Sequence, residues 1–225
     1  MRKGDEKRLE LLNTAERLFC QQGYEKTSVQ DVLTATSLSK GGFYHHFASK
    51  EDVLTALCIR RAERAAAFTA DALNQASTPM ERINAVLYGF MPLRQEEASF
   101  AAMLLPTIDG PEGRAIAMTY QDALAEHFQP LLKAEIAAAM AVEAVFPPVK
   151  DIEGVILNTV NHCWMEVAAR IYACTRDGKR YDQLSLLNTL EKYRRAVEVL
   201  LDAPYGTIEI IRVEEWDEVA RSILG

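Results

Sequence analysis

The chain has 225 residues, of which 49% are hydrophobic and 25% are charged, and its formal net charge at pH 7 is -7. A chain of this length can bury a core large enough to fold without disulfide or metal staples. It has no run of eighteen uncharged apolar residues and no apolar leader-like segment at its N-terminus, so we expect a soluble, cytoplasmic protein with no membrane span.

The charge is unevenly divided along the chain. Residues 1–50 contain eight basic and six acidic side chains, whereas residues 51–225 contain 17 basic and 26 acidic ones. Phosphate neutralisation is therefore confined to the N-terminal fifth. This distribution disfavours one alternative function, a nonspecific nucleoid-type DNA binder, because such a protein needs a broad basic face.

The cysteines are scattered and form no CxxC pair. Each lies among helix-forming residues rather than in a loop-rich frame, which favours reduced core thiols over a redox or metal role. The four are Cys20, Cys58, Cys163 and Cys174.

The first two predicted helices have clear boundaries. Apolar residues at spacings of three and four predict a helix over residues 5–22, which Gly23 ends. Ser28 followed three residues later by Asp31 is a capping-box pattern. It predicts a short second helix over residues 29–35.

Two further capping residues follow closely. Ser39 is expected to cap a third helix of barely two turns that runs through Phe47. Ser49 with Asp52 repeats the capping box and opens a long fourth helix over residues 50–75. Three caps within some twenty-five residues predict short helices and tight turns.

The rest of the chain also has helical periodicity, so the fold class is predicted to be all-α with nine or ten helices. Pro130 must kink or split the helix that contains it. Residues 205–213 alternate somewhat like a strand but have no partner strand, so we expect an extended linker there. A fifth helix is predicted to begin at Pro79. The helices after it are predicted to span residues 96–105, 112–145, 152–174, 181–201 and 214–224.

Residues 28–47 combine a helix, a short turn and a second short helix, and a further helix precedes them. This arrangement lets one helix enter the major groove of DNA. The later helix of this pair, which Ser39 caps, contains two adjacent glycines, and each of them costs about 1 kcal/mol of helix stability relative to alanine. Glycine allows close approach to another surface, while Lys40, Tyr44 and His45 supply donors for phosphates and base edges.

The residues of this segment form a near-continuous motif. It consists of Gly23-Tyr24, Thr27-Ser28-Val29-Gln30-Asp31-Val32, Leu38-Ser39-Lys40-Gly41, Phe43-Tyr44-His45-His46-Phe47 and Ser49-Lys50-Glu51. The motif resembles the DNA-binding domain of TetR-family transcriptional regulators over roughly residues 7–54. The resemblance implies an N-terminal three-helix DNA-binding domain with a helix-turn-helix over residues 1–50. A helical ligand-binding and dimerisation domain would then occupy residues 51–225.

The resemblance also implies individual roles. Positions that contact operator phosphates in the family are occupied by Thr27, Ser28, Tyr44 and Lys50. Positions that face the groove are occupied by Ser39, Lys40, Gly41, Gly42 and His45. His46 and Phe47 look like a structural pair of the family. Taken singly, each residue also has a purely structural explanation, as a cap, a core side chain or a solvated lysine, and their joint register favours DNA contact.

Two positions depart from the family pattern. The turn carries Ser37 where the family usually has glycine, which is expected to strain the turn. Gly42 stands where a small polar residue is common, which shifts the expected specificity to Lys40 and His45.

The C-terminal part contains no G-x-S-x-G, P-loop, GxGxxG or HExxH motif, so we expect no enzyme, no cofactor and no metal site. Its helices instead combine large apolar side chains, Phe90 and Met118 among them, with sparse polar ones, as in an apolar pocket with a few orienting groups. The ligand-binding candidates are Tyr88, Met91, Phe100, Met103, Tyr120, His127, Asn158, His162, Trp164, Met165 and Glu166.

Asn158, His162 and Glu166 are spaced four residues apart, which predicts one polar face on an apolar helix. That face suits a polar ligand head group. The competing interpretation, which we favour, is that His162 and Glu166 pair with each other or across a dimer seam. A metal-binding or enzymatic alternative based on these two residues and His127 has too few ligands and a nonspecific spacing.

In TetR-like proteins the last two long helices form a four-helix seam with a second subunit. Here these helices are residues 152–174 and 182–201. The second one carries a suitable apolar stripe of Leu186, Leu187, Leu190, Tyr193, Val197 and Leu200.

A homodimer is also expected because one short recognition helix makes too few base contacts. The resulting hypothesis is a repressor that binds a palindromic operator as a dimer. A small, partly apolar effector would release it by favouring a second state through residues 50–75. Repression is favoured over activation.

Overall fold

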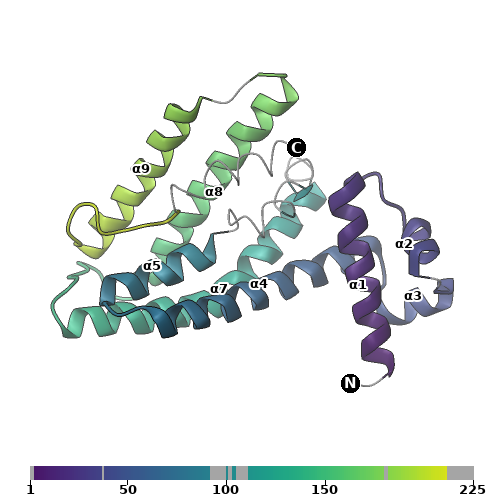
Figure 1. The fold of residues 1–225 in the computed structure, drawn as a ribbon, viewed down its shortest axis with the longest axis horizontal. Helices are drawn as coiled ribbons and strands as arrows, with labels where there is room; N and C mark the ends of the chain where they lie inside the picture. The colour runs from purple at the N-terminus through teal and green to yellow at the C-terminus, as the bar shows by residue number, and fades with distance from the viewer. Residues whose placement is uncertain are drawn as a thin grey trace.

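The computed structural model describes residues 3–36, 38–91, 100, 103–104, 111–179 and 182–211. Over these residues the only regular secondary structure is helical, as predicted. The helices are α1 (Lys3–Gln22), α2 (Val29–Thr36), α3 (Lys40–His46), α4 (Lys50–Gln75), α5 (Pro79–Phe90), α7 (Pro111–Ala141), α8 (Glu153–Arg176) and α9 (Gln183–Leu201). Figure 1 shows α1, α2 and α3 at one end of an elongated molecule, with α4 running from them into a larger helical lobe.

The N-terminal helices begin and end where their capping residues predict. Gly23 adopts a left-handed conformation with φ of 88° after the last residue of α1, and its N–H donates to the Phe19 carbonyl at 3.0 Å. The backbone N–H of Ser28 donates to Asp31 Oδ2 at 2.7 Å, and the N–H of Asp31 donates to Ser28 Oγ at 3.1 Å. The predicted capping box at the start of α2 is therefore confirmed.

The start of α4 differs in one detail from the prediction. Ser49 Oγ accepts the Asp52 N–H at 3.1 Å, as a cap should. The Asp52 carboxylate, however, accepts the backbone N–H of Ala48 at 3.0 Å instead of that of Ser49. The cap therefore fixes the residue before Ser49 and with it the connection from α3.

The helices of the larger lobe pack around α4 and α7. Pro130 lies inside α7 and does not split it, because one helix runs from Pro111 to Ala141. This helix ends four residues earlier than predicted. Gly89 of α5 lies against Thr69 of α4, so the two helices approach closely at this point.

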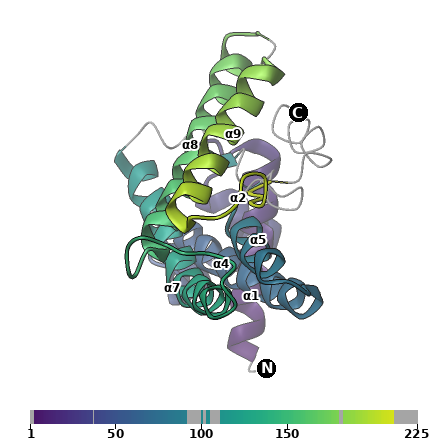
Figure 2. The same ribbon diagram turned by 90° about the vertical axis from the view of Figure 1, so that its left-hand side faces the viewer.

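Helices α8 and α9 form a helical hairpin on one side of the larger lobe (Figures 1 and 2). After α9 the chain turns at Tyr205-Gly206 and crosses toward α5. The side chains of Ile208 and Ile210 are buried. The expected extended linker is therefore packed against the lobe as far as residue 211. The predicted helices over residues 96–105 and 214–224 lie largely outside the described residues.

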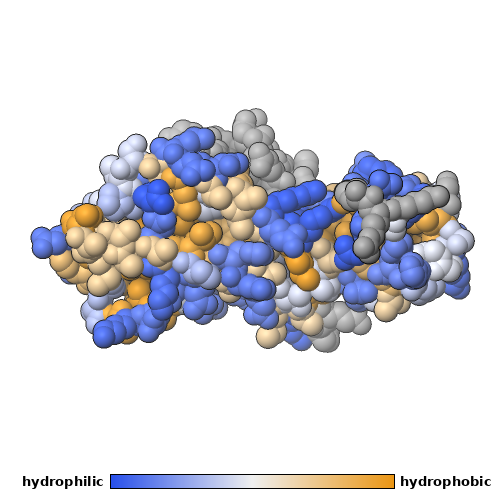
Figure 3. Space-filling model, turned by 90° about the horizontal axis from the view of Figure 1, so that it is seen from below, coloured by the Kyte–Doolittle hydropathy of each residue, from blue (hydrophilic) through white to orange (hydrophobic). Residues whose placement is uncertain are grey.

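The described residues show a largely hydrophilic surface and free cysteines. No helix among the described residues is long and apolar enough to cross a membrane. In Figure 3 hydrophilic residues cover much of both lobes. All four cysteines are free, and burial raises the pKa of Cys58 and Cys163 to about 12, which leaves these thiols protonated and unreactive.

Candidate DNA-binding surface and ligand cavity

Helix α3 has one buried and one exposed face. Ser39 caps it, because Ser39 Oγ accepts the Gly42 N–H at 3.1 Å. Phe43 and Phe47 are buried and anchor the helix to the N-terminal core. On the other side Lys40 and His45 are exposed. Together with Tyr44, these side chains form a small surface rich in hydrogen-bond donors.

Tyr44 is half exposed, with 50% of its surface in contact with solvent, although its ring lies edge-on to that of Phe43 at 5.3 Å. The ring is therefore in contact with a buried neighbour while half of the side chain remains accessible. This position does not match the alternative explanation of Tyr44 as a core residue.

The two glycines of α3 are not needed for packing within the chain. A Cβ atom on Gly41 would meet no atom within 4 Å, and one on Gly42 would lie 3.4 Å from Ser39 Oγ. Neither glycine has a positive φ. Neither packing within the chain nor backbone conformation therefore requires glycine at these two positions, although each glycine weakens the helix.

Two of the predicted phosphate-contacting residues have structural roles in this conformation. Thr27 is only 1% exposed, and its hydroxyl donates to the Gly23 carbonyl at 2.8 Å and accepts from Gln22 Nε2 at 3.2 Å. Thr27 thus closes the turn between α1 and α2. Ser28 is exposed, but its side chain is the cap of α2. Ser37 lies outside the described residues.

Lys50 and its neighbour Glu51 hold the start of α4 against this turn. Lys50 Nζ donates to the Tyr24 carbonyl at 3.0 Å and lies 4.1 Å from the centroid of the Tyr24 ring. The Tyr24 hydroxyl donates to Glu51 Oε1 at 3.1 Å. A hydrogen bond to its own backbone is the largest of the influences that lower the pKa of Glu51. The sequence did not reveal this clamp, because its members are 26 and 27 residues apart.

A cavity of about 500 Å³ lies between α7 and α8. It brings together four of the predicted ligand-binding residues: Tyr120, His162, Trp164 and Met165. The other residues that line it are Leu104, Arg114, Ala117, Met118, Gln121, Leu124 and Asn161. Of these, sequence reasoning noted only Met118, as one of the large apolar side chains of the region. Rings and aliphatic side chains make up most of the lining, and a few polar groups accompany them, as expected for an organic ligand.

The remaining candidates for ligand binding do not line this cavity. Tyr88 lines a separate hollow between α4 and α5. Met91, Phe100 and Met103 are buried core residues. His127 is half-buried on α7 and Asn158 is exposed on α8, and neither is part of the cavity lining. The predicted polar face on α8 is wrong as a single ligand-reading surface, because its members have different neighbours.

Glu166 shows this most clearly, since it joins α8 to α9. Its carboxylate accepts hydrogen bonds from Lys192 Nζ at 2.7 Å, the Tyr193 hydroxyl at 2.9 Å and Arg170 at 2.9 Å. The hydrogen bond from Lys192 is the main reason that the pKa of Glu166 falls to about 2. The favoured interpretation that His162 and Glu166 pair with each other is therefore wrong, because the Glu166 carboxylate is bonded to Arg170, Lys192 and Tyr193 of its own chain. Pairing across a dimer seam stays a prediction.

The described residues contain no cluster of three or more His, Cys, Asp or Glu side chains that could hold a metal ion. Glu166 is engaged with basic side chains and the Tyr193 hydroxyl. His162 lines the cavity, whereas His127 does not. The alternative metal site built on these three residues therefore has no support in the geometry.

The apolar stripe predicted on α9 is largely used within the chain. Leu186, Leu190 and Val197 are buried, and the other three members are half-buried. The stripe as a whole is therefore not a free dimer surface, which corrects the prediction. Large apolar side chains that are exposed on α8 and α9 include Val155, Leu184 and Val199.

The N-terminal part of the chain is similar in sequence to known bacterial regulatory proteins. Residues 11–57 match a family model described as bacterial regulatory proteins of the tetR family. The chain is 39% identical over 54 residues to the HTH-type transcriptional regulator YerO of Bacillus subtilis, which is 24% of this chain and 19% of YerO. It is 32% identical over 77 residues to the HTH-type transcriptional repressor KstR2 of Mycobacterium tuberculosis, or 34% of this chain and 38% of KstR2. The matched segments thus span well under half the length of these relatives.

The fold itself extends the likeness beyond the N-terminal segment. The structure of GusR from Salmonella enterica superposes with a TM-score of 0.61 at 17% sequence identity, covering 90% of this chain and 99% of GusR. At this identity the likeness establishes the shared fold over nearly the whole chain. The match to the family model, over residues 11–57, lies in α1 to α4 and includes α3.

Proposed function

We propose that the chain, whose residues 11–57 match the model of the tetR family of bacterial regulatory proteins, is a ligand-responsive transcriptional repressor of this family. It binds a palindromic operator as a homodimer and is released by a small, partly apolar effector. Residues 1–50 form the DNA-binding domain, and residues 51–225 bind the effector and the second subunit.

The observation that carries this proposal is the exposed face of α3. A short capped helix, anchored by Phe43 and Phe47, presents Lys40, Tyr44 and His45 to the outside. Lysine suits phosphates and guanine edges, and the two glycines allow the helix backbone to approach the groove. The DNA-contacting set is then Ser28, Ser39, Lys40, Gly41, Gly42, Tyr44 and His45, while Thr27 and Lys50 hold the helices in position.

The cavity between α7 and α8 supports an organic effector. Trp164 and Tyr120 provide aromatic surface, while His162 and Asn161 provide hydrogen-bonding groups for a polar end. An effector changes operator affinity only through its different affinities for the two states of the protein. A coupling of about 1–3 kcal/mol corresponds to a roughly 5- to 150-fold loss of operator affinity.

Two-fold symmetry supports the dimer. One α3 helix of seven residues reads few base pairs, whereas two helices related by symmetry read both half-sites of a palindrome. The outer faces of α8 and α9 are the proposed contact with the second subunit. Val155, Leu184 and Val199 are apolar side chains exposed there.

The test is binding of the purified protein to its own upstream intergenic DNA against scrambled DNA at fixed, near-physiological salt. The variant Lys40→Ala/Tyr44→Ala is expected to lose at least about 2 kcal/mol, or roughly 30-fold in affinity, since each specific contact contributes ~1–3 kcal/mol. Lys150→Ala/Tyr205→Ala removes the same two exposed residue types at the far end of the molecule and should bind like the wild type. Equal affinity of both variants would refute the assignment of α3.

A further inference from the structure

A mostly buried ion-pair junction joins α4 to α1. Arg61 Nη2 lies 2.6 Å from Glu16 Oε1, and Arg61 Nε donates to the same oxygen at 2.8 Å. Arg60 pairs with the other carboxylate oxygen and also donates to Asn13 Oδ1 at 2.8 Å. Thus one carboxylate of the N-terminal lobe holds two guanidinium groups of the helix that enters the larger lobe.

The junction continues toward the ligand cavity through two aromatic rings. The Arg61 guanidinium carbon lies 4.3 Å from the centroid of Phe100, which is only 1% exposed. The Phe100 ring meets that of Tyr120 edge-on, with centroids 6.2 Å apart and an interplanar angle of 74°. Tyr120 lines the cavity. An unbroken series of side-chain contacts therefore runs from the cavity wall to α1.

The junction is also imperfectly satisfied, which makes it sensitive to small shifts. Arg60 Nε is buried and has no hydrogen-bond partner, and burial is the largest of the influences that lower the Arg60 pKa. Arg61 is held between a carboxylate and an aromatic face, and both contacts depend on the position of its planar group. A displacement of Phe100 therefore changes how Arg61 meets Glu16.

We propose that Arg61 is the positioning residue through which the cavity controls the N-terminal lobe. An occupant that moves Tyr120 displaces Phe100, which alters the Arg61–Glu16 contact and thereby the orientation of α1 relative to α4. This inference rests on the proposed function in so far as the occupant is the effector. The mechanical connection itself depends only on the contacts from Tyr120 to Glu16.

The first test compares two losses of a buried ring. Phe100→Leu removes the ring that faces Arg61, whereas Phe128→Leu removes an equally buried ring that packs on Phe90. Amide hydrogen exchange in α1 around Glu16 should quicken about tenfold in Phe100→Leu relative to Phe128→Leu. This corresponds to ~1.4 kcal/mol, within the range of a desolvated cation–π contact. Equal exchange in the two variants would overturn the proposal.

A charge-conserving pair provides a second test that leaves the core intact. Arg61→Lys keeps the positive charge but loses the planar group that stacks on Phe100, while Arg64→Lys makes the same change at an exposed position one turn away. Only Arg61→Lys should quicken exchange in α1. No difference between the two lysine variants would contradict a positioning role for Arg61.

A third test asks whether Tyr120 and Phe100 act one after the other. If Tyr120 and Phe100 act in series, Tyr120→Leu combined with Phe100→Leu should quicken α1 exchange no more than the stronger single variant. Strictly additive effects would refute a serial path. All three readouts are independent of DNA. Absence of selective DNA binding by the wild type would therefore defeat the proposed function, whereas unchanged α1 exchange would defeat the junction.

Discussion

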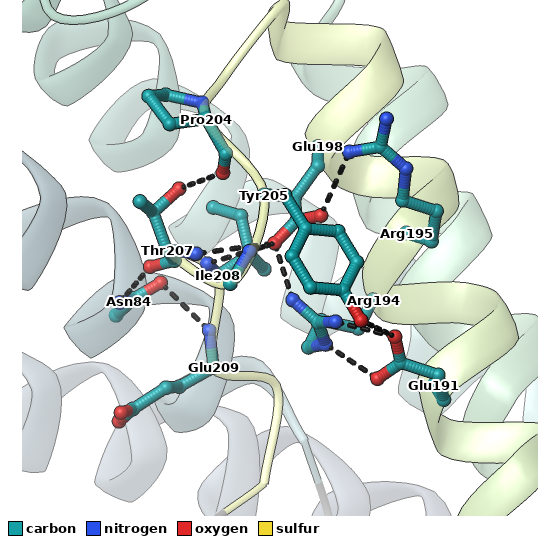
Figure 4. A network of polar contacts seen from close by, with 11 residues as sticks. Asn84, Glu191, Arg194, Arg195, Glu198, Pro204, Tyr205, Thr207, Ile208 and Glu209 are labelled. Carbon is teal, nitrogen blue, oxygen red and sulfur yellow. Dashed lines mark hydrogen bonds and ion pairs between the residues drawn. The ribbon is translucent and has the colours of Figure 1, made fainter.

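Glu198 of α9 is completely buried, yet its carboxylate accepts five hydrogen bonds (Figure 4). Two come from the guanidinium groups of Arg194 and Arg195. The other three come from the backbone N–H groups of residues 206–208, at 2.7, 3.1 and 3.4 Å. A single acidic side chain therefore fastens the segment after α9 to the helix itself.

Asn84 of α5 fixes the same segment from the other side. Its amide nitrogen donates to the Thr207 carbonyl at 2.8 Å, and its oxygen accepts the Glu209 N–H at 3.0 Å. With both contacts, the backbone of residues 206–209 has partners on two helices. This explains why an alternating segment stays extended here without a partner strand.

We expect Glu198→Gln to destabilise the fold by about 3 kcal/mol. The variant keeps the size of the side chain but leaves the mostly buried Arg194 without its buried counter-ion, and loss of one partner of a buried pair costs ~3–5 kcal/mol. We expect a loss at the lower end of this range because Arg195, the other cation paired with Glu198, is half exposed and can be solvated by water. Urea unfolding measures the loss.

Glu191→Gln is the matched control for this measurement. Glu191 bonds the same Arg194 but is exposed on α9, so its loss should cost less than about 1 kcal/mol. Similar unfolding midpoints for the two variants would show that Glu198 does not fasten the C-terminal segment.

Residue identity in the site was only partly predictable. Lys40 and His45 follow from their place on a short helix, and both are exposed as expected. Burial of Thr27 could not be foreseen, because it depends on how the turn after Gly23 closes. The partners of Glu166 were missed because Lys192 and Tyr193 are 26 and 27 residues away and meet it only when α8 and α9 pack.

At the scale of elements, helix boundaries were the most predictable feature. Helix α4 spans the predicted residues, Lys50–Gln75, since a serine cap marks its start. Capping residues act through neighbours within four positions, so sequence alone exposes them. Packing between helices is different. Which face of α9 lies against α8 depends on the path of the connecting chain, and half of the residues of the predicted dimer stripe are buried within the chain.

The crossing of α4 and α5 predicts the outcome of a glycine substitution. A Cβ atom at Gly89 would lie 1.8 Å from Thr69 Oγ1 and 3.2 Å from Phe128 Cε1. Replacing a glycine inside a helix by alanine normally stabilises the helix by about 1 kcal/mol. Here overpacking should reverse the sign and destabilise by ~1–3 kcal/mol, measured by thermal unfolding.

Gly154→Ala tests whether this cost arises from the crossing. Gly154 is also helical, but its added Cβ would lie at an ordinary 3.6 Å from Gln129 Nε2. This substitution should be neutral or stabilising by a few tenths of a kcal/mol up to ~1 kcal/mol. If both glycine variants were equally stable, α4 and α5 would not pack as closely as described.

In the whole molecule, α4 joins the two lobes, and the proposed function depends on this connection. It begins at the clamp of Lys50 on Tyr24, carries Arg61 at the junction with α1, and ends among the helices of the larger lobe (Figure 1). The sequence predicted α4 as a transmitter but could not reveal Glu16 as its partner, which lies 45 residues away. The cavity was likewise only half predicted, because its lining comes from two helices and Leu104.

The proposed function requires that two copies of this chain read a palindrome through α3. Selection of random-sequence DNA duplexes by the effector-free protein, followed by sedimentation of the complex, tests it most directly. We expect enrichment of an inverted repeat whose half-sites are about one helical turn, ~34 Å, apart, with two chains on each duplex. Absence of any enriched sequence, or one chain bound to a single half-site, would contradict it.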